Sequence, residues 1–243
     1  MQGRDYIRRY NEEGNALARK MAEQAIALDS EFPGAYRLLA GTHMMDVWFR
    51  WSKSPRDSIK KGISLLKKAN AIDPSFAGAH GSLSQFYTLA RQHEKAIAEG
   101  EKAIALDPNS ADFHGFLGMA LNFADRPNDA IPLFEKAIRL NPIPPTWYLS
   151  NLGVSYRMTG RYDEAIEMYK KALQRSPTNL FAHLGLTATY SLSGQETEAH
   201  AQAEEVMKIN PKFSLQRFSK VLPFKNQATN KRVIDALRKA GLK

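Results

Sequence analysis

The sequence predicts an all-α fold, a right-handed superhelical solenoid built from antiparallel helix pairs. The first observation is a series of prolines at spacings of 34, 34, 35 and 34 residues, namely Pro74, Pro108, Pro142, Pro177 and Pro211. The second is a helical run before each proline, which cannot continue a helix. The third is a hydrophobic content of 43%, enough for a core that stacked units can bury. We expect about five full repeats, a partial N-terminal repeat and a C-terminal capping helix.

Small and large apolar residues recur at fixed positions within this period. One unit carries Leu152, Gly153, Tyr156, Gly160, Tyr162, Ala165, Tyr169 and Ala172. The preceding unit carries Leu117, Gly118, Ala130, Phe134 and Ala137. Small residues allow close approach of the two helices of a unit, A and B, and large ones fill the gap to the next unit. A 34-residue period with this pattern resembles the tetratricopeptide repeat.

The repeats define the expected domain organisation. We expect a solenoid over residues 1–211 and a basic helical cap over residues 212–243. The solenoid divides into a partial repeat, a repeat with an extended helix and an insertion, and four regular repeats, at residues 1–30, 31–76, 77–110, 111–145, 146–179 and 180–211. Residues 15–28 read as a helix B with too little chain before them for a full helix A. We therefore expect a fragment, or a neighbouring domain that covers this end.

An insertion of ten residues lies between Ser30 and Pro74, around residues 44–56. We expect helix A of this repeat to continue to about Trp51 and Pro55 to open helix B, because proline is tolerated in a first helical turn. Three aromatic residues lie here, at Trp48, Phe49 and Trp51. We favour packing against the preceding helices and the inserted loop, and a protein contact is the alternative.

Several sequence segments outside the general repeat pattern resemble those of a narrower family. They are Phe49–Pro55, Arg126-Pro127 before residues 130–133, Asn141–Leu149, Asn210–Leu215, Leu222–Lys225 and Leu237–Leu242. Together they resemble the C-terminal repeat region of bacterial class III adenylate/guanylate cyclases. None of the metal-binding or nucleotide-binding parts of the cyclase is present in this sequence. The resemblance therefore implies a regulatory or interaction module rather than cyclase activity.

The net charge of +9 is concentrated at one end of the chain. Residues 212–243 hold nine basic residues and one acid, and the other 211 residues together carry only +1. The basic tail includes Arg217, Lys220, Lys225, Lys231, Arg232, Arg238 and Lys239. We expect helices near 213–222 and 230–240 to form a cap with a basic outer surface. A solenoid that follows phosphates should spread its cations along one face, so RNA binding is the less favoured alternative.

The sequence carries no motif that indicates catalysis, a cofactor or a metal. Phosphate-binding glycine patterns and H-E-x-x-H are absent, and there are no cysteines. The same repeat position holds a histidine in three of the regular repeats, namely His80, His114 and His183. Equivalent positions in stacked helices lie about 10 Å apart, whereas a zinc–histidine bond is about 2 Å. We expect a non-enzymatic protein in which these histidines serve packing.

The helix-A side chains should line an inner groove. The register assigns to it Ser82, Gln85, Gly115, Met119, Asn122, Asn151, Val154, Arg157, Leu184, Ala188 and Ser191, with Phe123 nearby. This surface is mostly small, neutral or apolar, and Arg157 is its clearest charge. Such a groove suits an extended or helical apolar peptide, and the alternative is a solvated groove that binds nothing.

We therefore expect an interaction scaffold with a protein or peptide partner, as a regulatory domain of a larger bacterial signalling protein. One alternative is a free-standing adaptor that self-associates through residues 48–51 or through the open N-terminal end, and another is an RNA-binding helical repeat. No apolar run approaches the roughly 20 residues that span a bilayer, and we expect a cytoplasmic location.

Overall fold

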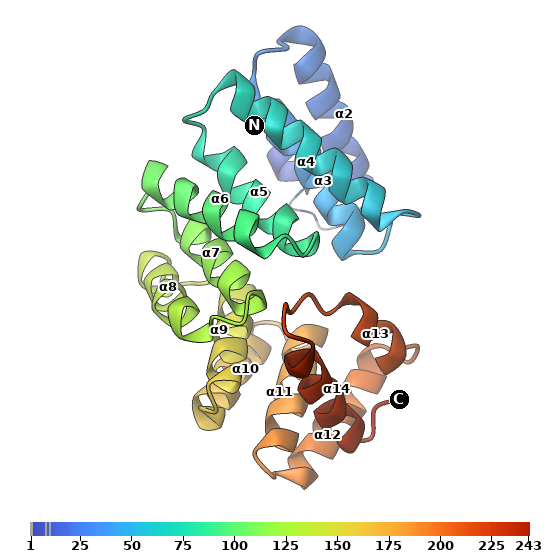
Figure 1. Ribbon diagram of the computed structural model, residues 1–243. Helices are drawn as coiled ribbons and strands as arrows, with labels where there is room; N and C mark the ends of the chain where they lie inside the picture. The colour runs from blue at the N-terminus through green and yellow to red at the C-terminus, as the bar shows by residue number, and fades with distance from the viewer. Residues whose placement is uncertain (1, 8, 10) are drawn as a thin grey trace. The chain divides into compact units, whose positions relative to one another are not determined.

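The structure, a computed structural model, describes residues 2–7, 9 and 11–243 and divides into two compact units, Met1–Asn109 and Ser110–Lys243. The described residues form fourteen helices and no strand (Figure 1). The predicted fold class, an all-α solenoid of helix pairs, is confirmed.

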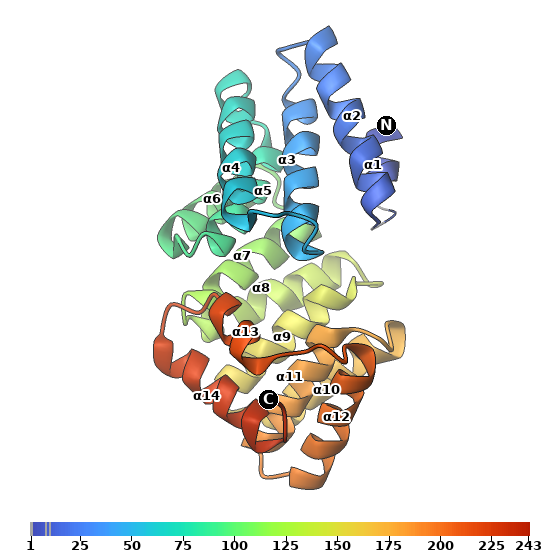
Figure 2. The same cartoon turned by 90° about the vertical axis from the view of Figure 1, so that its right-hand side faces the viewer.

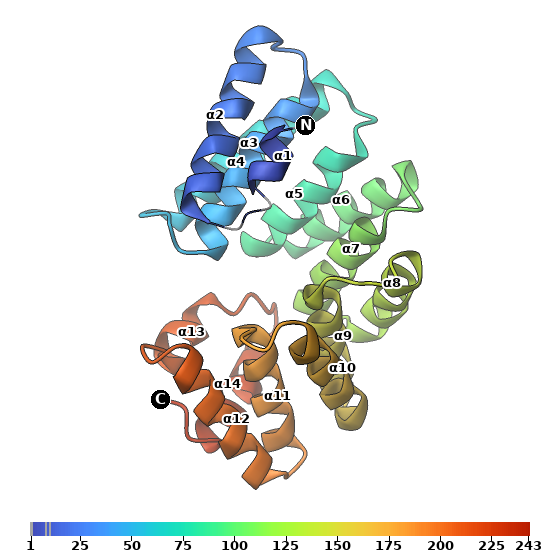
Figure 3. The same cartoon turned by 180° about the vertical axis from the view of Figure 1, so that it is seen from behind.

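Unit 1 holds the partial repeat, the repeat with the insertion and one regular repeat. Its helices are α1 (Gln2–Ile7), α2 (Glu12–Leu28), α3 (Pro33–Trp48), α4 (Pro55–Ile72), α5 (Ala77–Leu89) and α6 (His93–Leu106). Each helix packs against the next one along the chain, so this unit is a stack of consecutive antiparallel neighbours (Figure 3). Short α1 completes the partial repeat by packing on α2 and α3.

Unit 2 holds three regular repeats and the cap. The repeats are the pairs α7 (Ala111–Phe123) with α8 (Pro127–Leu140), α9 (Thr146–Met158) with α10 (Tyr162–Arg175), and α11 (Leu180–Leu192) with α12 (Glu196–Ile209). The cap holds α13 (Leu215–Val221) and α14 (Gln227–Lys239). Within this unit α9 packs on α8 and α11 packs on α10, whereas α14 packs on α11, which is itself a helix A (Figure 2).

The ten extra residues of the second repeat are shared among three elements. α3 has 16 residues and α4 has 18, against 13 in α5 and 14 in α6. The rest lengthen the connection between them, residues 49–54. α3 ends at Trp48 rather than at the predicted Trp51, because the chain turns at Arg50, whose φ is 58°. The left-handed conformation is incompatible with a continuing right-handed helix.

Pairs of complementary size join the two helices of each repeat. A Cβ atom on Gly118 would lie 2.8 Å from the ring of Phe134, and one on Gly153 would lie 2.9 Å from the ring of Tyr169. The equivalent pairs in the neighbouring repeats combine a small residue of helix A with an even smaller one of helix B, as Ser84 with Gly100 and Thr187 with Ala203. The aromatic ring therefore occurs where helix A has glycine, as close packing of a core requires.

Candidate functional site: the inner face of the repeats

In unit 2 the A helices are α7, α9 and α11. We call the surface formed by their side chains the inner face. Four of the predicted groove residues are partly exposed on it: Met119, Phe123, Asn151 and Val154. Asn151 is committed to its own helix, because its Nδ2 donates to the carbonyl oxygen of Trp147 at 2.8 Å. The accessible part of the inner face is therefore small, neutral and partly apolar.

Asn122 does not line an open groove. It is completely buried, and its Nδ2 donates to the carbonyl oxygen of Asn151 at 2.9 Å. Its Oδ1 accepts from the Ser155 hydroxyl at 2.7 Å. The amide therefore joins α7 to α9. Burial of a polar group requires such partners, which explains why this side chain turns between the helices.

Arg157 was the one clear charge expected in the groove, and the structure buries it. Only 5% of its surface is exposed. Its positive charge acts on buried Tyr169, where burial raises the pKa of the hydroxyl and Arg157 opposes that rise. Arg157 therefore belongs to the packing of this repeat, and the inner face loses the cation that the sequence predicted for it.

The α11 part of the inner face is covered. Leu184 is 4% exposed and Ser191 is 8% exposed, and every residue from Ala182 to Ser191 is buried. The reason is α14, which packs against α11. Position in the repeat correctly predicts that these side chains belong to helix A, but the expected open surface does not extend over them.

The two predicted groove residues of unit 1, Ser82 and Gln85, are partly exposed on α5. The Ser82 hydroxyl donates to the carbonyl oxygen of Gly78 at 2.9 Å and accepts from Nε of Arg37 at 3.2 Å. Arg37, on α3, is a cation that the repeat register does not assign to this surface. Arg37 lies in helix A of the repeat with the insertion, and this position is the signal that could have assigned it to the surface.

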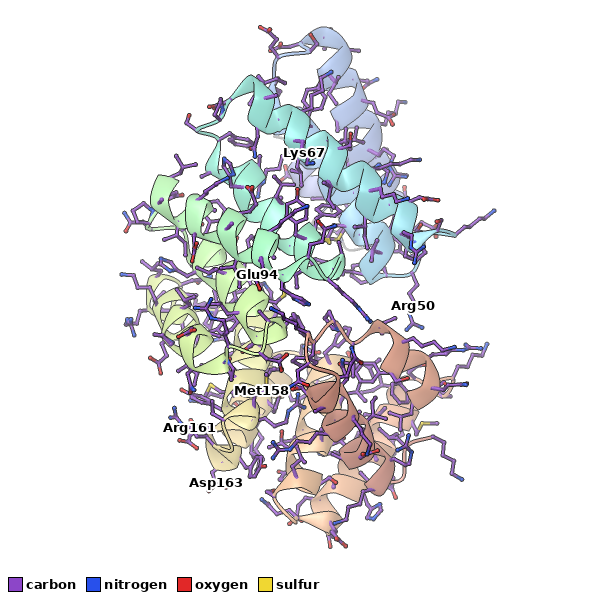
Figure 4. All side chains as sticks on the ribbon, viewed as in Figure 1. Arg50, Lys67, Glu94, Met158, Arg161 and Asp163 are labelled. Carbon is purple, nitrogen blue, oxygen red and sulfur yellow. The ribbon has the colours of Figure 1, made fainter. Side chains whose placement is uncertain are left out.

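The aromatic residues of the insertion lie at the end of α3. Trp48 is 47% exposed and Phe49 is 43% exposed, so packing within the chain uses only part of their surface. The rings of Phe49 and Trp51 stack with centroids 4.9 Å apart. Arg50 lies between them in sequence, and Figure 4 shows its side chain projecting beyond the end of the helix. The favoured expectation, packing alone, therefore leaves a large apolar surface unexplained.

The repeated histidines bridge the parts of one repeat. His80 and His183 are buried, and each places Nε2 near the carbonyl oxygen of a helix-ending proline, Pro74 at 3.1 Å and Pro177 at 2.8 Å. His80 Nδ1 lies 2.6 Å from a carboxylate oxygen of Glu99 in helix B. Over the part of the chain that the structure describes, no group of three or more acidic or imidazole side chains could hold a metal ion.

The basic side chains of the cap face solvent. All seven predicted tail residues are exposed: Arg217, Lys220, Lys225, Lys231, Arg232, Arg238 and Lys239. Asp235 pairs with Lys231 at 2.5 Å and with Arg238 at 2.7 Å. The hydrogen bond from Lys231 lowers the pKa of the Asp235 carboxyl. Part of the tail's positive charge is therefore paired within α14.

Comparison with known families identifies the repeats. Residues 111–144 and 147–179, both in unit 2, match the tetratricopeptide repeat. The chain therefore contains tetratricopeptide repeats. No curated protein matches it by sequence.

Solved structures of similar fold cover most of the chain. A chain of the APC/C Cut9–Hcn1 hetero-tetramer aligns with a TM-score of 0.74 and 18% identity, over 93% of this chain and 40% of that one. PilW, a type IV pilus biogenesis factor, has a TM-score of 0.66 and 19% identity, over 86% and 90%. YrrB, described as a TPR protein with an unusual peptide-binding site, has a TM-score of 0.53 and 20% identity, over 82% and 97%. These likenesses show the fold.

None of the helices in the described ranges is both long and apolar enough to cross a membrane.

Proposed function

We propose that the chain is a non-catalytic scaffold that takes a peptide or protein segment on the inner face of unit 2. The observation that carries this proposal is the tandem of matched repeats, whose partly exposed row of Met119, Asn151 and Val154 is neutral. Stacked repeats leave an extended surface of this kind, and a neutral row suits an apolar segment. The described peptide-binding site of YrrB, which shares the fold, supports the search for a peptide here.

A photocrosslinking amino acid at position 154 tests this proposal in source cells. The matched control carries the same group at Gln174, which is exposed on helix B of the same repeat. We expect a partner adduct from position 154 that position 174 does not give. A further variant carries the crosslinking group at position 119, and adding Val154→Glu to that variant should abolish its adduct. Equal adducts from positions 154 and 174 would contradict binding on the inner face.

We propose further that this module regulates a bacterial signalling protein related to the class III cyclases. Support comes from the phrases at residues 49–55, 141–149 and 210–215, which resemble the repeat region of that family. An antibody against this region should recover a polypeptide larger than 27.3 kDa, and the recovered fraction should form a cyclic nucleotide from ATP or GTP. A 27.3 kDa polypeptide without that activity would support the adaptor alternative.

The adaptor alternative has one observation in its favour, the exposed surface of Trp48 and Phe49. If this segment joins two copies of the chain, Trp48→Lys should convert a dimer into a monomer in light scattering. A chain that is monomeric before the substitution contradicts self-association through these residues.

A further inference from the structure

Asp125 stands at a turn position where two other repeats have glycine. It connects α7 to α8 with a φ of 60°, and Gly160 and Gly194 occupy the equivalent turns with φ of 80° and 81°. Residues with a Cβ atom pay about 1 kcal/mol or more for this left-handed conformation, although aspartate tolerates it better than most. Arg91 occupies the equivalent turn between α5 and α6 with a φ of 57°, so a side chain is tolerated here, and that of Asp125 makes a contact that glycine could not make.

This contact is with the cap. Oδ2 of Asp125 accepts from the backbone N–H of Asn226 at 2.6 Å, and Oδ1 accepts from the Thr229 hydroxyl at 2.6 Å. Asn226 is the N-cap of α14, and its own side chain accepts from the N–H of Ala228 at 2.9 Å. A carboxylate is favourable at this end because the helix dipole is positive there. Asp125 therefore holds the start of α14 from a distant repeat.

Phe224 strengthens the attachment immediately before α14. It is buried, and its ring meets that of Phe123 edge-on, with centroids 4.9 Å apart. The N–H of Lys225 donates to the carbonyl oxygen of Phe123 at 2.7 Å. The end of α7 thus offers an apolar ring, a backbone acceptor and a carboxylate, and all three are used by the chain's own residues 224–229.

Further along α14 the contacts reach the next two repeats. Arg232 donates to the Tyr162 hydroxyl at 2.6 Å, at the start of α10. Lys239 pairs with Glu196 at 2.7 Å, at the start of α12. A helix of 13 residues is about 20 Å long, which matches two steps of about 10 Å between neighbouring helices. The cap therefore binds across three repeats, as a separate helical ligand would.

The cap is also tied to itself. α13 packs on α14, and the N–H of Leu215 donates to the carbonyl oxygen of Lys243 at 2.7 Å. Residues 210–214 connect it to α12, and five residues can span about 17 Å when extended. A surface hollow of about 510 Å³ lies between α12 and residues 240–242.

We propose that the cap, residues 212–243, is an exchangeable element, and that the surface formed by Phe123, Asp125 and α11 takes the cap of a second copy of this chain. Exchange of an identical element preserves every contact and costs only the association entropy and the opening of the connection. This interaction surface is distinct from peptide binding at Met119 and Val154 and does not depend on it.

Two full-length variants test the exchange by complementation. Asp125→Gly removes the acceptor carboxylate and leaves at the turn the residue that two other repeats use, so the fold is retained. Phe224→Ala with Thr229→Ala weakens the cap and leaves the acceptor intact. Each variant alone should be monomeric at 27.3 kDa. We expect their mixture to form a 1:1 complex of twice that mass in light scattering.

Asp129→Asn is the matched control, because Asp129 pairs with Arg126 beside the same turn at 2.8 Å and is exposed. Mixed with the weakened-cap chain, it should give no complex, since its own cap stays bound. Hydrogen exchange of residues 222–243 completes the test. A cap that remains protected in Asp125→Gly would overturn the role of Asp125. Released caps in both variants, with a mixture that stays monomeric, would overturn the exchange.

Discussion

The helices α9 and α11 occupy the same place in consecutive repeats, yet only α9 contributes accessible side chains to the inner face. Asn151 and Val154 on α9 are partly exposed, whereas residues 182–191 on α11 are all buried. The difference is α14, which lies along α11 (Figure 1). A repeat position therefore determines which way a side chain points, and the remainder of the chain determines whether it can meet a partner.

The largest effect should come from loosening α14, which should remove the difference in accessibility between α9 and α11. Leu237 is fully buried in α14, and truncating a leucine in a packed site costs about 2–5 kcal/mol. In Leu237→Ala we expect faster hydrogen exchange over residues 184–191 and little change over residues 151–157. Equal acceleration of both segments would mean that the whole unit has loosened and that α14 is not a separate cover.

The bridge between α7 and α9 should give the next largest effect. In Asn122→Ala two hydrogen bonds between α7 and α9 are lost, and each contributes about 0.5–1.5 kcal/mol. Chemical denaturation should show this loss in the free energy of unfolding. Asn151→Ala is the control, because that amide bonds only within its own helix. A loss as large in the control would refute the bridge.

A smaller effect is expected where α9 packs on its own helix B. In Gly153→Ala the new Cβ atom would lie 2.9 Å from the ring of Tyr169, which is 1% exposed and cannot move aside. Overpacking costs about 1–3 kcal/mol, and the better helix propensity of alanine returns about 1 kcal/mol. We expect a net loss of about 1 kcal/mol in thermal unfolding. A stabilised Gly153→Ala protein would show that this repeat is loosely packed.

The smallest effect should come from acid, at the far end of α14. The hydrogen bond from Lys239 lowers the pKa of Glu196 below its ordinary value of 4.5. A carboxyl with a lowered folded-state pKa adds stability above pH 4.5, and this is lost as the pH falls through the folded-state pKa. The protection factors of residues 236–240, which correct for the intrinsic pH dependence of amide exchange, should therefore fall more between pH 6 and pH 3.5 in the wild-type chain than in Glu196→Gln. Identical responses would show that this pair does not hold α14.

The helix pairs could be predicted from sequence, and their ends only in part. The prolines and the alternation of small and large residues gave the regular repeats, because both signals act within one period. The end of α3 was missed by three residues, since no local signal announces the left-handed turn at Arg50. Asn122 and Arg157 were assigned to the groove by register alone, and register does not distinguish a side chain in a groove from one between two helices.

The sequence by itself determined the repeat architecture, because a 34-residue unit carries its own helix stops and its own complementary pair, such as Gly153 with Tyr169. Only the tertiary structure decided which inner face is accessible. Asp125 and Asn226 are 101 residues apart, and nothing near either residue announces their contact. The physical reason is that secondary structure follows short-range periodicity, whereas the covering of α11 requires the closure of a long loop that a single period cannot encode.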